Sequence, residues 1–350
     1  MKFSPLGNSG LQVSRVCLGS MTWGLQNNQQ EADAQIEYAM AQGVNFIDTA
    51  EMYAIPPSPQ TYGKTEEIIG HWLARNPSLR SQLILATKVA GSGLSWIRNG
   101  SPISGKSVIE AVDGSLKRLQ TDYIDLYQLH WPNRTTPHFG RHQPNAILPT
   151  SINRAQEIAQ FHDILVGLEH CVKAGKIRHC GLSDDTPWGI SQYLNLAKDH
   201  NLPMMVSIQN EFSLLHSKDW PYLIEHCVLE NIAYLPWSPL AGGLLSGKYL
   251  NGAKPKGSRL TLTQRHGNFR STADSERAIA SFCDIAQRHK LTPAQLALAW
   301  CDQVDGVTAT IIGATTLAQL KENITSFELT LSADVLSEIN QTLAKYPQPF

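Results

Sequence analysis

The sequence predicts a (β/α)₈ barrel formed by the whole chain, residues 1–350, as one domain. First, eight short apolar runs of strand length alternate with amphipathic stretches of helical length. Second, 350 residues exceed the roughly 250 that such a barrel usually needs. Third, no linker rich in proline or glycine divides the chain. A hydrophobic content of 42% with 17% charged residues is enough for one large core.

The predicted elements form eight strand–helix pairs in chain order. In residue numbers, each strand range being followed by its helix range, they are 15–19 and 31–42, 44–48 and 64–75, 83–89 and 106–119, 123–130 and 155–174, 177–183 and 187–199, 204–209 and 217–230, 232–238 and 274–289, and 309–313 and 316–324. The surplus forms an N-terminal β-hairpin turning at 7–10, a C-terminal helix over 332–345, and long loops at 53–63, 90–105, 131–154 and 248–273. An open doubly wound sheet is the alternative. It requires a glycine-rich dinucleotide turn after the first strand, and "GSMTWG" (19–24) does not have that spacing.

Charge and composition narrow the class of protein. The net charge of −1 argues against nucleic acid as a partner. The N-terminus lacks the apolar segment of a secretory signal, and no run reaches the roughly 18 apolar residues of a membrane helix. The six cysteines form no C-x-x-C pair and are interpreted as reduced thiols. We therefore expect a cytoplasmic protein without nucleic-acid or membrane partners, whose oligomeric state stays open.

Polar residues end three neighbouring strands, where a barrel places its active site. Strand alternation brings Asp48, Lys88 and His130 to the inner side, and Tyr53 follows on a loop. A lysine ammonium stabilises a phenolate and lowers its pKa from about 10. An aspartate offsets the desolvation of that lysine, and a histidine can donate a hydrogen bond to a carbonyl oxygen. Each residue alone is more often a cap, turn or packing residue; their joint occurrence predicts a proton-donating site.

At these residues the sequence resembles the aldo-keto reductases, and most closely the bacterial Tas-type reductases. The resemblance rests on "DTAEMY" (48–53), "ATKV" (86–89), "YIDLYQLHWP" (123–132), "QNEFSLL" (209–215), "PWSPLAGGLLSGKY" (236–249) and "GATTLAQLKEN" (313–323). It implies that Asp48, Tyr53, Lys88 and His130 are the catalytic tetrad of an enzyme that reduces aldehydes or ketones. The potassium-channel β-subunits, more distant relatives, imply the alternative of a cofactor-sensing regulatory subunit with little turnover.

The resemblance also implies a nicotinamide cofactor, NADPH rather than NADH. Trp237 is expected to stack on the nicotinamide, and Ser183, Asp184 and Gln209 to meet its carboxamide. The other residues implied for cofactor binding are Ser20, Met21, Asp48, Ser238, Pro239, Leu240, Ala241, Gly242, Leu244, Lys248, Arg259, Gly313, Thr315, Gln319, Glu322 and Asn323. Many relatives have asparagine at position 184, and many carry basic residues in the segment 313–320, which is uncharged here.

Charge gives independent support for a phosphate-bearing ligand. Between 248 and 273 there are basic residues at 248, 254, 256, 259, 265 and 270 and no acidic one. Arg259 is the candidate for the extra phosphate of NADP. A solvated surface loop is the alternative interpretation.

Smaller signals complete the picture. Trp23 and Trp131 are expected to line the pocket for a small carbonyl substrate. "GSPISGKS" (100–107) matches a phosphate-binding loop and would make Lys106 part of a nucleotide triphosphatase, but no strand directly precedes it. His138 and His142 have the spacing of zinc ligands on a helix, yet prolines at 137 and 144 flank them, so they are interpreted as loop residues without a metal.

Overall fold

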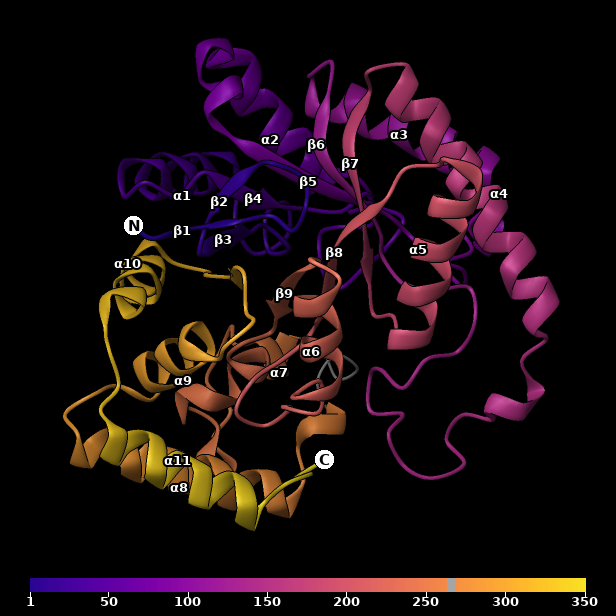
Figure 1. The fold of residues 1–350 in the computed structure, drawn as a ribbon. Coiled ribbons are helices and arrows are strands. Elements are labelled where there is room, and N and C mark those ends of the chain that lie inside the picture. Colours follow the sequence, from indigo (N-terminus) through magenta and orange to yellow (C-terminus); the bar gives the residue numbers. More distant parts are fainter. Residues whose placement is uncertain (263–267) are drawn as a thin grey trace.

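The computed structural model describes residues 1–262 and 268–350; Arg265, one of the predicted basic loop residues, lies outside them. Eight parallel strands form a nearly closed barrel surrounded by helices, which confirms the predicted fold class (Figure 1). The backbone N–H of Thr308 donates to the carbonyl of Tyr234 at 3.0 Å and joins the last strand to its neighbour. Around the barrel the order is β10 (Thr310–Ile312), β3 (Val16–Gly19), β4 (Phe46–Asp48), β5 (Ile84–Val89), β6 (Ile124–Leu129), β7 (Ile177–Ser183), β8 (Met205–Glu211) and β9 (Ala233–Trp237).

The helices pack outside the strands, and the predicted C-terminal helix is present. It is α11, which lies beside α8 at the bottom of Figure 1. No helix in the described part of the chain is long and apolar enough to cross a membrane. The helices are α1 (Gln29–Ala41), α2 (Lys64–Arg75), α3 (Gly105–Leu119), α4 (Arg154–Lys173), α5 (Pro187–His200), α6 (Tyr222–Leu229), α7 (Arg259–Leu262), α8 (Ala273–Arg288), α9 (Pro293–Gln303), α10 (Leu317–Thr325) and α11 (Ala333–Lys345).

Helix α9 is not among the predicted strand–helix pairs, although the residues at its start carry a clear sequence signature of a helix N-terminus. Thr292 is its N-cap, Pro293 occupies the first turn, and Gln295 completes a capping box with Thr292. This combination satisfies the free N–H groups of a helix start and is a known sequence signature. The helix was missed because the strand–helix alternation assigns only one helix between two strands.

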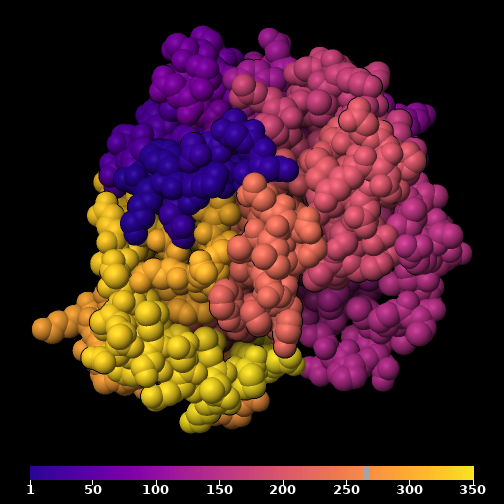
Figure 2. Space-filling model, viewed as in Figure 1, coloured from indigo at the N-terminus to yellow at the C-terminus, as the bar shows by residue number. Residues whose placement is uncertain are grey.

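The predicted N-terminal hairpin is present as β1 (Phe3–Pro5) and β2 (Gln12–Ser14), and its turn lies at the amino end of the barrel, against Val206 and Ala233. Its Leu6 and Val13 are fully buried and pack in the cluster that fills the barrel interior. Gly7 has a φ of +53°, and a Cβ there would lie 2.4 Å from the carbonyl oxygen of Val206, so the close approach requires glycine. Figure 2 shows this segment, in indigo, lying across the surface of the molecule.

Alternation within the strands sets which side chains face the barrel interior. Phe46 and Ala86 belong to the inner cluster, whereas Ile47 and Leu85 pack outward beneath the helices. Because successive side chains point to opposite faces, the inner column of β4 ends at Asp48. The fold therefore places a carboxylate at the carboxyl end of the barrel, where active sites lie.

Candidate active site

A buried ion pair joins the ends of β4 and β5. The Nζ of Lys88 lies 2.6 Å from Oδ2 of Asp48, and it also donates to the carbonyl of Thr49 at 2.8 Å. The Lys88 side chain has no exposed surface. The other carboxylate oxygen of Asp48 accepts from the side-chain amides of Gln128, at 3.1 Å, and Gln209, at 2.9 Å. These donors offset the desolvation of the carboxylate and hold it in one orientation.

Tyr53 and Lys88 meet above this ion pair. The Lys88 Nζ lies 5.1 Å from the centroid of the Tyr53 ring. Burial alone would lower the pKa of Lys88, but the combined effects of Asp48, Tyr53 and Cys17 outweigh it, so the net pKa is raised and the ammonium is maintained. Burial also raises the pKa of Tyr53 above its usual 10, and Lys88 opposes this only in part. Lys88 therefore acts on the pKa of Tyr53 in the expected direction, but the desolvation of the phenol exceeds its effect.

His130 completes the group. It directly follows β6, and its ring meets the Tyr53 ring edge-on with centroids 5.6 Å apart. Burial, assisted by Lys88, holds the pKa of His130 well below 6.5, so the imidazole is neutral at physiological pH. Its Nδ1 is buried without a hydrogen-bond partner among the described residues. A neutral imidazole can donate one hydrogen bond to an oxygen of a bound ligand. The structure thus brings Asp48, Tyr53, Lys88 and His130 together, as their positions at strand ends predict.

The residues expected around a nicotinamide lie next to this group. Trp237 ends β9, and its Nε1 donates to Oδ1 of Asp184 at 3.1 Å. Ser183 donates from its hydroxyl to the carbonyl of Gln209 at 2.8 Å. The amide nitrogen of Gln209 is committed to Asp48, so Gln209 links the predicted cofactor residues to the predicted catalytic residues.

Asp184 is the acidic residue expected at the carboxamide of the nicotinamide. Its side chain is buried, and the backbone has a φ of +52°, a region that asparagine and aspartate tolerate best. Burial raises the pKa of Asp184 well above its usual value, and the nearby Glu211 adds to the rise while Trp237 opposes it. A carboxyl kept protonated both donates and accepts, as an asparagine amide does.

The segment after β9 forms a tight backbone loop. Ser238, Ala241, Gly242 and Gly243 all have positive φ between +49° and +93°. A Cβ added to Gly243 would lie 3.2 Å from the Nζ of Lys248, so the lysine lies directly over the glycine pair. Such a run of backbone amides beside cations is the usual chemistry of a phosphate site. Leu240 packs against the core here, Leu244 is buried, and Pro239 lies in the same turn.

Arg259 begins α7 and approaches the same loop. Its Nη2 lies 3.6 Å from the sulfur of Met21, and a Cβ on Gly242 would lie 3.9 Å from its Cδ. Burial and the neighbouring Arg270 lower the pKa of Arg259 to about 10, so it stays charged at neutral pH. On the other side of the loop Ser20 donates to the carbonyl of Asp48 at 2.8 Å.

The residues expected at the adenosine end lie just before α10 and along it. Gln319 accepts from the backbone N–H and the hydroxyl of Thr315, both at 2.9 Å, and Asn323 donates to the carbonyl of Gly313 at 3.2 Å. Glu322 accepts from the hydroxyl of Thr292 at 2.6 Å. A Cβ on Gly313 would meet nothing within 4 Å, so this side of the helix start is open. These groups fit the polar end of a dinucleotide.

The two tryptophans expected at the substrate pocket have different positions. Trp131 lies beside His130 with ring centroids 5.0 Å apart, and its Nε1 donates to the carbonyl of Ser92. Trp23 is fully buried in the main core and donates to Gln35 at 3.1 Å. Trp23 therefore presents no surface to a substrate, and the expectation for it is corrected. The position of Trp23 after the first strand of the barrel correctly placed it at the carboxyl end. It did not show that the side chain points into the core.

The loop formed by residues 131–153 covers the end of β7. Several of its side chains contact the predicted cofactor residues, which the sequence analysis did not predict. Phe139 stacks on Trp237 with ring centroids 5.8 Å apart, and Thr136 donates to the carbonyl of Asp184. His138 lies 3.5 Å from Oδ1 of Asp184, and burial lowers its pKa to about 3. No periodic pattern marks these contacts. His142 packs on the ring of His216 rather than on His138, as expected for residues of an irregular loop.

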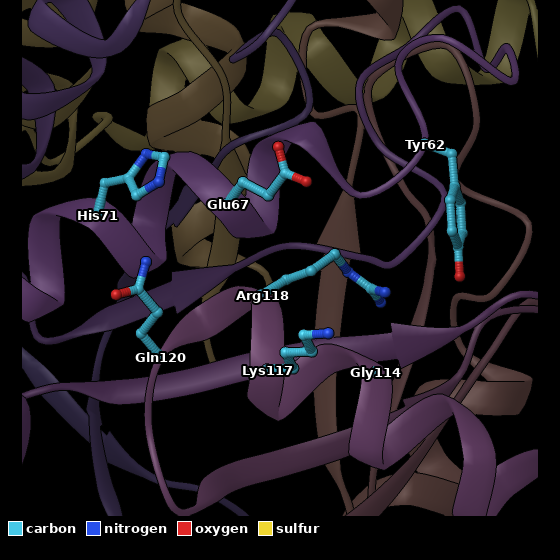
Figure 3. A pocket seen from close by; sticks show the side chains of 7 residues that line it. All are labelled: Tyr62, Glu67, His71, Gly114, Lys117, Arg118 and Gln120. Atoms are coloured by element: carbon cyan, nitrogen blue, oxygen red, sulfur yellow. The ribbon is translucent and has the colours of Figure 1, made fainter.

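Residues 100–107 match the sequence pattern of a phosphate-binding loop, but their structure does not form a phosphate site. The first helical N–H, of Gly105, is taken by the carboxylate of Asp163 at 2.7 Å, and the side chain of Lys106 is 88% exposed. A carboxylate at that helix start would repel a phosphate. A separate hollow of about 480 Å³ lies between α2 and α3, away from the tetrad (Figure 3). The residues that line it are Tyr62, Glu67, His71, Gly114, Lys117, Arg118 and Gln120.

Comparison with known proteins assigns this barrel to a family of oxidoreductases. The model of the aldo/keto reductase family matches residues 15–344, so the chain belongs to this family. It is 45% identical to "Protein tas" of Escherichia coli, over all of this chain and 99% of that protein. It is 31% identical to "Uncharacterized oxidoreductase YrpG" of Bacillus subtilis, over 97% and 95% of the two chains. It is 29% identical to "Probable voltage-gated potassium channel subunit beta" of Arabidopsis thaliana, over 99% and 98%.

Proposed function

We propose that this oxidoreductase uses NADPH to reduce small aldehydes or ketones to alcohols. One observation carries the proposal: the buried pair of Asp48 and Lys88 lies beneath the Tyr53 ring, with the neutral His130 ring beside it. This arrangement suits protonation of an oxygen that gains negative charge as its carbon is reduced. The cytoplasm, with its supply of reduced dinucleotide, is the compartment that fits this chemistry.

Each residue has a defined part. A nicotinamide, when bound, supplies the hydride. Tyr53 gives its hydroxyl proton to the substrate oxygen, and the Lys88 ammonium stabilises the phenolate that remains. Asp48 holds Lys88 in place, and His130 donates a hydrogen bond that orients the carbonyl. The raised pKa of Tyr53 keeps the phenol protonated, the form that can donate a proton.

Several groups support the assignment of the cofactor. Trp237 offers an aromatic face, and a protonated Asp184 can both donate to and accept from a carboxamide. Lys248 and Arg259 flank the glycine pair, where the phosphates would lie. Of these two cations, Arg259 is our candidate for the additional phosphate of NADPH, the group that NADH lacks.

The test combines turnover with binding. NADPH oxidation is measured with a panel of aldehydes and ketones for the native protein and for Tyr53→Phe. Binding is followed through tryptophan fluorescence titrated with NADPH and NADH. We expect the substitution to lower turnover about 10²- to 10⁴-fold, with unchanged binding and tighter binding of NADPH than of NADH. Turnover that survives the substitution contradicts the role of Tyr53.

A cofactor-sensing regulatory subunit is the second candidate. It is favoured by the full-length similarity to the probable potassium channel β-subunit. It predicts quenching of tryptophan fluorescence by NADPH without oxidation of the cofactor by any carbonyl in the panel. The same assay therefore separates the two candidates.

A further inference from the structure

Glu51 is a fully buried carboxylate in the turn between Asp48 and Tyr53. Its Oε1 accepts from the backbone N–H of Ala90 at 2.6 Å and from Arg98 Nη2 at 2.5 Å. Its Oε2 accepts from Arg98 Nη1 at 2.9 Å and from the hydroxyl of Tyr62 at 3.3 Å. Four donors from three segments thus converge on one side chain that belongs to neither the tetrad nor the cofactor residues.

The contacts of Glu51 join the segments that hold the proton donor and its lysine. Its backbone N–H donates to the carbonyl of Lys88 at 3.2 Å, and its carbonyl accepts from Gly63 at 2.9 Å. Ala90 comes two residues after Lys88 at the end of β5, and Gly63 closes the loop that begins with Tyr53. Glu51 therefore ties the loop containing Tyr53, at both its start and its end, to the strand containing Lys88.

An apolar side chain at position 51 could not accept these hydrogen bonds and so could not join the same segments. A buried carboxylate needs several donors to offset its desolvation, and a pair of charges is a costly way to gain stability alone. What the charged pair supplies is a fixed geometry, since a bidentate guanidinium allows one relative placement of the two loops. Reaction rates respond steeply to placement, and an error of about 1 Å can cost about 100-fold.

We propose that Glu51, clamped by Arg98, is a positioning residue that sets the distance between the Tyr53 phenol and the Lys88 ammonium. The inference rests on the proposed reductase activity and assigns a further residue to it. Glu51 touches no reacting atom; it acts through the backbone of the turn that precedes Tyr53 and of the end of β5.

Glu51→Gln tests this because it keeps the shape and removes half of the acceptors. A glutamine has one oxygen and one NH₂ group in place of the two oxygens. Whichever way its amide lies, one of the two sets of donors now on Glu51 loses its acceptor. We expect kcat to fall about 10- to 100-fold, with the KM and dissociation constant for NADPH unchanged, because the cofactor residues are not part of this network.

Asp125→Asn is the matched control, since it alters the same kind of network at the other end of β5. Asp125 is also buried, accepts a backbone N–H of β5, from Leu85 at 3.0 Å, and pairs with Arg80 at 2.7 Å. We expect this variant to lose stability while its kcat, expressed per folded molecule, stays at the native value. Stability of both variants is measured by urea unfolding, and assays are run where each is folded.

If Glu51→Gln alone does not fold, the double variant Glu51→Gln with Arg98→Met carries the test, because it removes the guanidinium that would be left unpaired. Lower kcat in the double variant, with native cofactor affinity, supports the positioning role. A kcat equal to that of the native protein, or reduced no more than in Asp125→Asn, overturns it. Failure of the proposed function is distinguishable: the native protein then shows no carbonyl turnover, or turnover that Tyr53→Phe leaves unchanged.

Discussion

At the amino end of β5, Asp125 accepts the N–H of Leu85 and pairs with Arg80; at the carboxyl end, Glu51 accepts the N–H of Ala90 and pairs with Arg98. Both carboxylates are fully buried; Asp125 on β6 pairs with an arginine of the 77–82 segment, whereas Glu51 joins two loops. The two ends therefore share a buried carboxylate, a backbone donor and an arginine partner, although Asp125 also accepts from Arg178 at 2.9 Å.

The surroundings of the two pairs differ. Arg80 also donates to the carbonyls of Leu83 and Tyr123, so the amino-end pair fastens one backbone segment to another. At the carboxyl end Glu51 lies two residues before Tyr53, and Ala90, whose N–H it accepts, lies two residues after Lys88. In barrels of this kind the carboxyl end holds the chemistry and the amino end contributes stability. The comparison teaches that the same kind of buried ion pair can either stabilise the barrel or position reacting groups. Which role it has depends on the residues in the segments that it joins.

The largest effect is expected from Lys88→Met, which breaks the Asp48–Lys88 ion pair at the carboxyl end of the barrel. Turnover should fall about 10²- to 10⁴-fold because Tyr53 loses its ammonium. Unfolding free energy should fall by about 3–5 kcal/mol, because the Asp48 carboxylate stays buried without its cation. Both are measured, by NADPH oxidation and by urea unfolding. In the double variant with Asp48→Asn, stability should recover in part and turnover should not; recovery of turnover would contradict the assigned roles.

Next in size is Asp125→Asn, which breaks the pair at the structural end. We expect a loss of about 3 kcal/mol in unfolding free energy, at the low end for a broken buried pair because Arg80 keeps its carbonyl acceptors. The urea midpoint measures it. A variant as stable as the native protein would show that the amino-end pair does not stabilise the barrel.

A smaller and pH-dependent effect is expected from Asp184→Asn, at the functional end. The folded protein raises the pKa of Asp184, so above about pH 4 the folded state holds a proton that the unfolded state has released. Stability of the native protein therefore falls with rising pH in this window, by up to about 1.4 kcal/mol per pH unit for one proton. The Asp184→Asn variant has no proton at this site to lose, so its stability does not fall with pH for this reason. Its melting temperature relative to the native protein should rise with pH, and a pH-independent difference would contradict the protonated state.

The smallest effect is expected from Lys106→Ala, at a site that is neither functional nor structural. Its partner Glu110 lies 3.8 Å away, and both side chains are largely exposed. Unfolding free energy should change by less than about 0.5 kcal/mol and carbonyl turnover not at all. ATP hydrolysis that depends on Lys106 would revive the phosphate-binding loop.

Local patterns account for most of the fold and for the tetrad. The ends of β4 and β5 were predictable because period-2 alternation identifies the inner column of a strand, and Asp48 and Lys88 each close such a column. The position of Trp23 was not predictable in this way, since a loop residue has no periodicity to show which way it points. The net rise in the pKa of Tyr53 was also missed, because desolvation depends on all the groups packed around the phenol.

By itself the sequence determined the order of strands and helices, the end of the barrel where the chemistry lies, and the residue types gathered there. These properties depend on spacing along the chain, which hydrophobic periodicity and strand ends record. Only the tertiary structure decided which charges compensate one another. Glu51 and Arg98 are 47 positions apart, and Arg80 and Asp125 are 45 apart. Such pairs form because burial forces each carboxylate to find donors in space, and no local pattern carries that information.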